Sequence, residues 1–140
     1  MNTVGQDKTE LELPSQFEVI ERVAKVAAEF AARCGVGEME LFGIDLAIRE
    51  AVANAVKHGN REDAAKKVRV SFENIDNALV IKVADEGAGF DYENLPDPTD
   101  AENILKTSGR GIFLIRNFMD EVEWQRPAGG GTTLIMTKKI

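Results

Sequence analysis

The spacing of apolar residues changes between residues 56 and 68, and that change limits the possible folds more than any other feature. Over residues 17–56 apolar side chains recur every three or four positions, which indicates helices. Over residues 68–83 they alternate with polar residues, which indicates two strands joined by a hairpin-like turn at Asp76-Asn77. Helices followed by strands predict an α+β fold. We expect a two-layer α/β sandwich with helices on one face of a mixed, mostly antiparallel sheet.

The boundaries of the first elements follow from capping and breaking residues. Residues 1–9 are polar and are expected to be flexible, whereas Leu11-Glu12-Leu13 alternates as a short strand would. Ser15 and Glu18 form a capping-box pattern, which predicts a helix that starts there and ends near Gly35.

The remaining boundaries follow in the same way. A second helix is predicted from Glu38 to His58, with Gly59 as its C-terminal stop. Glycine, proline and aspartate dominate residues 85–108, and a long irregular segment of this kind is usually functional. A short helix over Ile112 to Met119 and a strand pair at Val122 to Gln125 and Thr132 to Thr137 complete the prediction.

Composition excludes several classes of protein. The 140 residues, 44% of them hydrophobic, fit one domain spanning residues 1–140 with its own core. A net charge of −7 argues against direct nucleic acid binding, which needs a basic surface. Cys34 is the only cysteine, and neither a leader nor a run of about 18 apolar residues is evident. We therefore expect a cytoplasmic protein with no membrane partner.

The second predicted helix carries a carboxylate and a carboxamide one turn apart. An apolar stripe at every fourth residue from Ile44 to Val56 should face the core, and Glu50, Asn54 and His58 fall roughly opposite it. Small alanines beside them leave room for a ligand. A carboxylate can act as a general base, and an amide oxygen can bind Mg²⁺. The alternative is that this face is simply the solvent face of an amphipathic helix.

Glycine-rich segments follow two of the predicted strands and precede one helix. Asp85-Glu86-Gly87-Ala88-Gly89 places a carboxylate acceptor beside exposed backbone at a strand end, although a plain turn has the same composition. Ser108-Gly109-Arg110-Gly111 before a helix can form an anion site or a flexible hinge. It fits neither a Walker A loop nor a dinucleotide fingerprint. Gly129-Gly130-Gly131 before Thr132 is, taken alone, a hairpin loop.

The order of these four motifs resembles the Bergerat ATP-binding fold of the GHKL superfamily, over residues 11 to 138. Within that superfamily the chain is most similar to the anti-sigma factor serine/threonine-protein kinases. Two stretches carry this likeness. Glu50–Gly59 matches Glu-Ala-Val-x-Asn-Ala-x-x-His-Gly, and Gly109–Val122 matches Gly-x-Gly-Ile-x-Leu-Ile-x-x-Phe-Met-Asp-Glu-Val.

The resemblance implies ATP and Mg²⁺ as cofactors, and it implies roles for individual residues. Asn54 would coordinate Mg²⁺, Asp85 would accept a hydrogen bond from the adenine amino group, and Glu50 would be the general base for a serine hydroxyl. Asp91 to Thr107 would form a lid, and His58 is expected to pack near the pocket. The other implied nucleotide-binding positions are Gly87, Gly89, Ser108, Gly109, Arg110, Gly111 and Thr132.

The resemblance also implies partners: an RNA polymerase sigma factor, an anti-anti-sigma protein of the STAS-domain class, and a second copy of the chain in a homodimer. A histidine-kinase fragment is disfavoured because the first helix carries no histidine. Gyrase-like and Hsp90-like ATPases need large further domains. The main alternative is a nucleotide-binding partner-switching module without kinase activity, and Glu50 favours the kinase over it.

Overall fold

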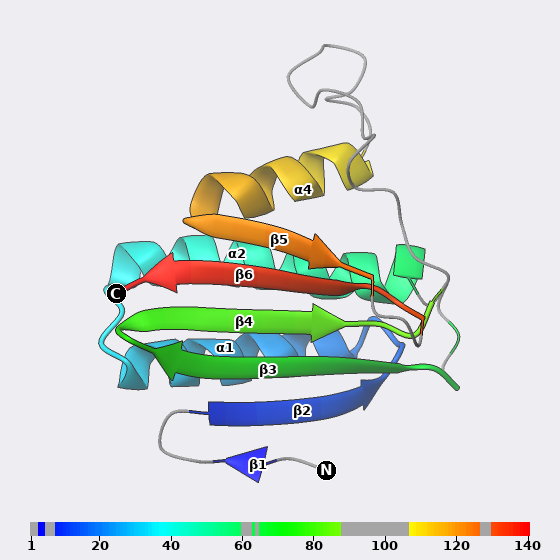
Figure 1. The fold of residues 1–140 in the computed structure, drawn as a ribbon, viewed down its shortest axis with the longest axis horizontal. Coiled ribbons are helices and arrows are strands. Elements are labelled where there is room, and N and C mark those ends of the chain that lie inside the picture. The colour runs from blue at the N-terminus through cyan, green and yellow to red at the C-terminus, as the bar shows by residue number, and fades with distance from the viewer. Residues whose placement is uncertain (1–2, 5–7, 60–62, 64, 88–106, 127–129) are drawn as a thin grey trace.

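A computed structural model of the chain describes residues 3–4, 8–59, 63, 65–87, 107–126 and 130–140. They form a six-stranded sheet in the order β1-β2-β3-β4-β6-β5, with the helices on one face of it (Figure 1). In chain order the elements are β1 (Thr3–Val4), β2 (Lys8–Pro14), α1 (Val19–Arg33), α2 (Glu38–Asn54), the π-helix η1 (Ala55–Gly59), β3 (Lys67–Ile75), β4 (Ala78–Ala84), α4 (Thr107–Phe118), β5 (Glu121–Gln125) and β6 (Thr133–Lys139).

The sheet has the predicted two-layer arrangement, and each described strand pair in it is antiparallel. The α+β prediction is therefore confirmed, while a parallel pair is not found among the described strands. The β3–β4 hairpin turns at Asp76 and Asn77, which have φ values of 51° and 60°. Tight hairpin turns need positive φ at both central residues, and Asp and Asn tolerate it better than most residues.

The core lies between the sheet and the helices, where the alternating apolar residues of the strands contact the apolar stripes of the helices. Every second residue of β3 and β4 faces the helices, and the predicted stripe of α2 faces the sheet. Phe30 of α1 packs on Phe72 of β3 with ring centroids 5.9 Å apart. The buried members of these sets are Ile44, Ile48, Val52, Val56, Val68, Val70, Phe72, Leu79, Ile81 and Val83.

The start of α1 differs from the prediction. The helix begins at Val19, and no side chain caps it, so the capping box of Ser15 and Glu18 is wrong. The Ser15 hydroxyl instead donates to the carbonyl oxygen of Lys66 at 2.8 Å, and the Ser15 amide donates to the same oxygen at 3.2 Å. This long-range contact ties the end of β2 to the segment before β3, and Phe17 lies 43% exposed outside the helix.

The N-terminal segment is more regular than its composition indicates. Residues 3–4 form β1, and residues 8 and 9 belong to β2, with Val4 paired to Thr9. Four of the nine residues expected to be flexible thus take part in the sheet. Thr9 shares the face of Leu11 and Leu13 and is 4% exposed, so pairing of this segment extends the buried side of the sheet.

None of the helices in the described ranges combines the length and the apolar character needed to cross a bilayer.

Candidate nucleotide-binding site

Asp85 follows β4 directly and is held by backbone groups from two directions. Its Oδ1 accepts hydrogen bonds from the amide of Gly87 at 3.0 Å and the amide of Thr132 at 3.2 Å. The Asp85 amide donates to the carbonyl oxygen of Thr132 at 2.9 Å. Both side-chain hydrogen bonds from described residues thus reach Oδ1. Oδ2 is left as an acceptor, on a residue that is only 8% exposed.

Gly131 makes this arrangement possible, although it is not among the predicted site residues. Its φ is +82°, and a Cβ added there would lie 2.1 Å from the carbonyl oxygen of Asp85. Only glycine allows the backbone before β6 to approach Asp85 this closely. The signal in the sequence was the triple glycine, but a hairpin loop explains that run equally well.

Two further polar side chains lie beside Asp85, and each has a polar atom with no hydrogen-bond partner among the described residues. The Asn54 amide nitrogen Nδ2 and the Thr132 hydroxyl Oγ1 are buried without a hydrogen-bond partner among the described residues. With Asp85 and small or apolar neighbours they line a hollow that has about 10 Å³ for a water-sized sphere, roughly one water molecule. Buried polar groups are normally satisfied, so unsatisfied ones clustered beside a free carboxylate oxygen indicate a ligand site.

Burial sets the protonation behaviour of Asp85. Removal from water raises the pKa of its carboxyl group, and hydrogen bonds from Gly87 and Thr132 and the charge of Lys66 oppose part of that rise. A carboxyl pKa that is higher in the folded than in the unfolded chain lowers stability above both pKa values. This penalty disappears as the pH falls below the pKa of the unfolded state.

Asp85→Asn should therefore raise the melting temperature of the ligand-free protein at pH 7. The amide cannot ionise, and its oxygen can still accept from Gly87 and Thr132. Thermal unfolding of wild type and variant should be followed from pH 7 down to pH 4, and the gain should shrink as the pH falls. A gain that stayed constant with pH would show that ionisation of Asp85 is not its cause.

The carboxylate proposed as a base lies next to this site on α2 but does not line the hollow. Glu50 is half-buried and precedes Asn54 by one helical turn. Directly after Asn54 the helix widens into the π-helical turn η1. Such turns occur frequently at functional sites, and no local residue pattern indicated this one.

The glycine motif that was predicted to bind phosphate lies in a helix rather than in a loop. α4 begins at Thr107 rather than at Ile112, so Ser108–Gly111 form part of the first helical turns instead of a preceding loop. The amides of the first helical turn have no intrahelical acceptor, so those of Ser108 and Gly109 remain free at the N-terminal end. By the same geometry the amides of Arg110 and Gly111 bond within the helix.

The other predicted positions are wholly or partly outside what the structure describes. Gly89 and nearly all of the predicted lid fall in residues 88–106, and the side chains of Ser108, Arg110 and His58 are not described either.

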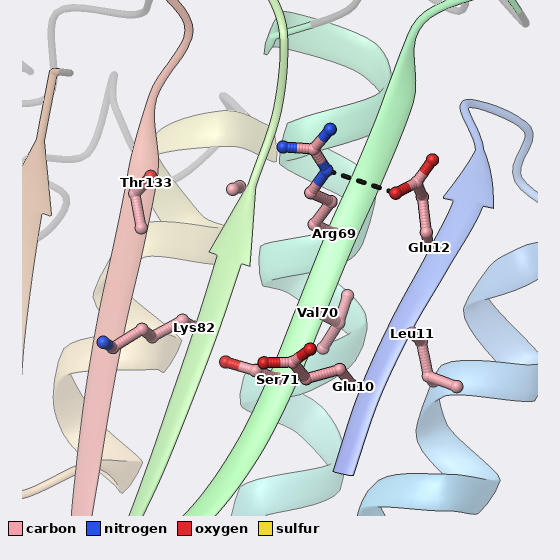
Figure 2. A pocket seen from close by; sticks show the side chains of 9 residues that line it. Glu10, Leu11, Glu12, Arg69, Val70, Ser71, Lys82 and Thr133 are labelled. Atoms are coloured by element: carbon pink, nitrogen blue, oxygen red, sulfur yellow. Dashed lines mark hydrogen bonds and ion pairs between the residues drawn. The ribbon is translucent and has the colours of Figure 1, made fainter. Parts of the chain in front are cut away.

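A larger hollow lies elsewhere, on the face of the sheet away from the helices. It has about 250 Å³ and lies over small residues of the central strands. Beside it Arg69 Nε and Glu12 Oε2 form an ion pair, 3.3 Å apart (Figure 2). Its polar side chains are exposed or half-buried, and none is buried without a partner. The better candidate for the functional site is therefore the hollow beside Asp85, which unsatisfied buried polar atoms line, rather than the larger hollow.

Comparison with known proteins identifies relatives over nearly the whole chain. The model of the histidine kinase-like ATPase domain matches residues 13–138. The serine-protein kinase RsbW of Staphylococcus epidermidis is 33% identical over 142 residues, which cover 96% of this chain and 88% of that protein. The RsbW of Bacillus subtilis (strain 168) is 31% identical over 140 residues, covering 96% and 86%.

A solved structure shows the same fold. The structure of the RsbU and RsbW domains of Rv1364c from Mycobacterium tuberculosis matches with a TM-score of 0.66 and 21% identity, over 94% of this chain. The present chain spans 31% of that longer chain.

The chain belongs to the histidine kinase-like ATPase domain family. Within it, the relatives above place the chain among the serine-protein kinases of the RsbW type. The resemblance to the GHKL serine kinases is thus confirmed.

Proposed function

We propose that this protein binds Mg·ATP between β4, α2 and the start of α4 and transfers the γ-phosphoryl group to a serine of an anti-anti-sigma protein. The observation that carries the proposal is the hollow that Asp85, Asn54 and Thr132 line together, in which Asn54 Nδ2 and Thr132 Oγ1 are buried without a hydrogen-bond partner among the described residues. The chain is proposed to act as one domain over residues 1–140.

Asp85 is the group that would recognise the base. An exocyclic amine on a purine presents a donor, and Asp85 Oδ2 is an acceptor whose partner oxygen Oδ1 is already fixed by two amides. Thr132 Oγ1 would bind the same ring system directly or through water. A purine with a carbonyl at that position offers an acceptor to an acceptor, so the site should prefer adenine to guanine.

Asn54 fits a magnesium site that is completed by the nucleotide. Mg²⁺ is commonly held by one or two protein oxygens together with phosphate oxygens and water, and a bound nucleotide triphosphate would supply the phosphate oxygens. Asn54 Oδ1 would be the protein oxygen, and its unpartnered Nδ2 remains available as a donor. The bound cation would neutralise charge on the phosphates. The free amides of Ser108 and Gly109 at the start of α4 would bind phosphate oxygens from the other side.

Glu50 would complete the transfer step. The serine Oγ of the protein substrate forms a bond to the γ-phosphorus while the bond from that phosphorus to the bridging oxygen of ADP breaks, and ADP leaves. The serine proton passes to the Glu50 carboxylate. Phosphoryl transfer depends mainly on positioning and charge neutralisation, so a half-buried carboxylate one turn from Asn54 suits this role.

The partners belong to the same proposal. Similarity to RsbW-type kinases over 96% of the chain supports an anti-sigma factor that holds an RNA polymerase sigma factor and phosphorylates a STAS-domain antagonist. A homodimeric, cytoplasmic protein is proposed on the same ground. The relatives are named as kinases, which favours the kinase over a nucleotide-binding switch without activity.

Calorimetric titration with ATP, GTP and Mg²⁺ tests the nucleotide site. Wild type should bind ATP more tightly than GTP. Asp85→Asn should lower ATP affinity about a hundredfold, because an amide donor would face the adenine amine. Asp76→Asn is the matched control, since Asp76 lies exposed in the β3–β4 turn and should leave affinity unchanged. A wild-type protein that binds no nucleotide would refute the proposal.

A further inference from the structure

Gly43 is a buried glycine in the interior of α2, where glycine costs about 1 kcal/mol relative to alanine. The structure offers a reason for it on α4. A Cβ added at Gly43 would lie 2.6 Å from Cδ1, 3.0 Å from Cγ and 3.2 Å from Cβ of Phe118. The Phe118 ring therefore occupies the space that any larger residue at position 43 would need.

We infer that Gly43 is a positioning residue for nucleotide binding: by admitting Phe118 it sets the spacing of α4 from α2, and with it the placement of the phosphate-binding turn relative to Asn54. This inference rests on the proposed nucleotide site. The contact between Gly43 and Phe118 lies at one end of α2 and α4, and the proposed site lies at their other end.

The phenylalanine cannot give way by ring rotation alone. Its own Cβ is among the crowded atoms, and that atom moves only with the α4 backbone. Other contacts hold the same helical turn: Ile115 is fully buried in the core, and the Arg116 guanidinium stacks over the Trp124 ring at 5.0 Å. A methyl group at position 43 should therefore displace α4 as a unit, by a few tenths of an ångström to about 1 Å.

The two helices run in opposite directions, so this displacement reaches the site. α2 leads from Gly43 to Asn54, and α4 leads back from its first turn to Phe118, side by side (Figure 1). Each helix is a rod with a rise of about 1.5 Å per residue, which places the contact about 16 Å from Asn54. Asp85, Gly131 and Thr132 belong to the ends of β4 and β6, not to α4, and should not move with it.

This separation gives a specific test. Affinities for Mg·ATP and for adenosine, which has no phosphates, should be measured by calorimetry and NMR titration for wild type, Gly43→Ala, Phe118→Leu and the double variant. Gly43→Ala should weaken Mg·ATP binding about tenfold, because binding geometry tolerates only about 0.5 Å of misplacement, and should leave adenosine binding unchanged. Phe118→Leu should show the same selectivity, and the double variant should regain affinity for Mg·ATP because the smaller side chain accommodates the methyl group.

Gly37→Ala is the control at the start of the same helix, where an added Cβ meets only the carboxylate end of the flexible Glu40 side chain. Three outcomes would overturn the inference. Gly43→Ala could weaken the binding of Mg·ATP and of adenosine equally, or leave Mg·ATP affinity unchanged. The double variant could also show the sum of the two single losses in Mg·ATP affinity. If Gly43→Ala does not fold, Phe118→Leu alone tests the inference. A loss of adenosine affinity as large as the loss of Mg·ATP affinity in that variant would overturn it. Wild type that binds neither ligand would overturn the proposed function and the inference with it.

Discussion

Gly131→Ala should destabilise the protein by about 3 kcal/mol and remove nucleotide binding at the same time. An alanine at a φ of +82° costs about 1–2 kcal/mol by itself. Its Cβ would also lie 2.1 Å from the Asp85 carbonyl oxygen, a backbone atom that no rotamer change can move away. The strand ends must separate, which breaks the hydrogen bonds that hold Oδ1 of Asp85. We expect ATP affinity to fall at least a hundredfold.

Gly130→Ala provides the control for this prediction. Its φ of +98° is equally unfavourable for alanine, but an added Cβ would meet nothing within 4 Å. The variant should lose only about 1–2 kcal/mol and should keep its nucleotide affinity. Urea denaturation with unchanged m-values gives both stabilities, and calorimetry gives both affinities. Equal effects of the two substitutions would show that backbone conformation, rather than contact with Asp85, explains the glycine at position 131.

These two glycines show what the sequence could and could not predict. Asn54, Asp85 and Thr132 carry polar atoms at the ends of predicted elements, and such residues can be singled out from local pattern. The structure places all three around one hollow. Gly131 has no side chain to indicate a role, and its approach to Asp85 depends on the pairing of β4 with β6. Neighbouring glycines with different roles are indistinguishable in the sequence.

The errors in the predicted elements also arise from contacts between distant parts of the chain. Ser15 has the right spacing from Glu18 for a capping box, but its hydroxyl donates a hydrogen bond to the carbonyl oxygen of Lys66, 51 residues away. The glycines before Ile112 have low helix propensity, yet α4 includes them. The contact between Gly43 and Phe118 also joins distant parts of the chain. Local propensity describes each segment correctly only when no tertiary contact competes for its groups.

Glu50→Gln should lower the rate of serine phosphorylation by a factor of about 10²–10⁴ while ATP affinity stays within about threefold of wild type. The substitution keeps the size of the side chain and removes its ability to accept the serine proton. Glu50 does not line the hollow at Asp85 and makes no hydrogen bond or ion pair with the described residues, so nucleotide binding should not depend on it. Transfer from labelled ATP to a purified STAS-domain antagonist measures the rate, and calorimetry measures the affinity.

The control for Glu50→Gln is Glu29→Gln, which changes the net charge by the same amount at an exposed position of α1. It should leave both quantities unchanged. A Glu50→Gln variant that transfers phosphate within tenfold of wild type would remove the general-base role and leave positioning by Asn54 and the start of α4 as the source of catalysis. Loss of ATP binding in the same variant would instead assign Glu50 to the nucleotide site. If transfer fails and binding persists, recognition and chemistry are separate on α2, with Asn54 serving the first and Glu50 the second.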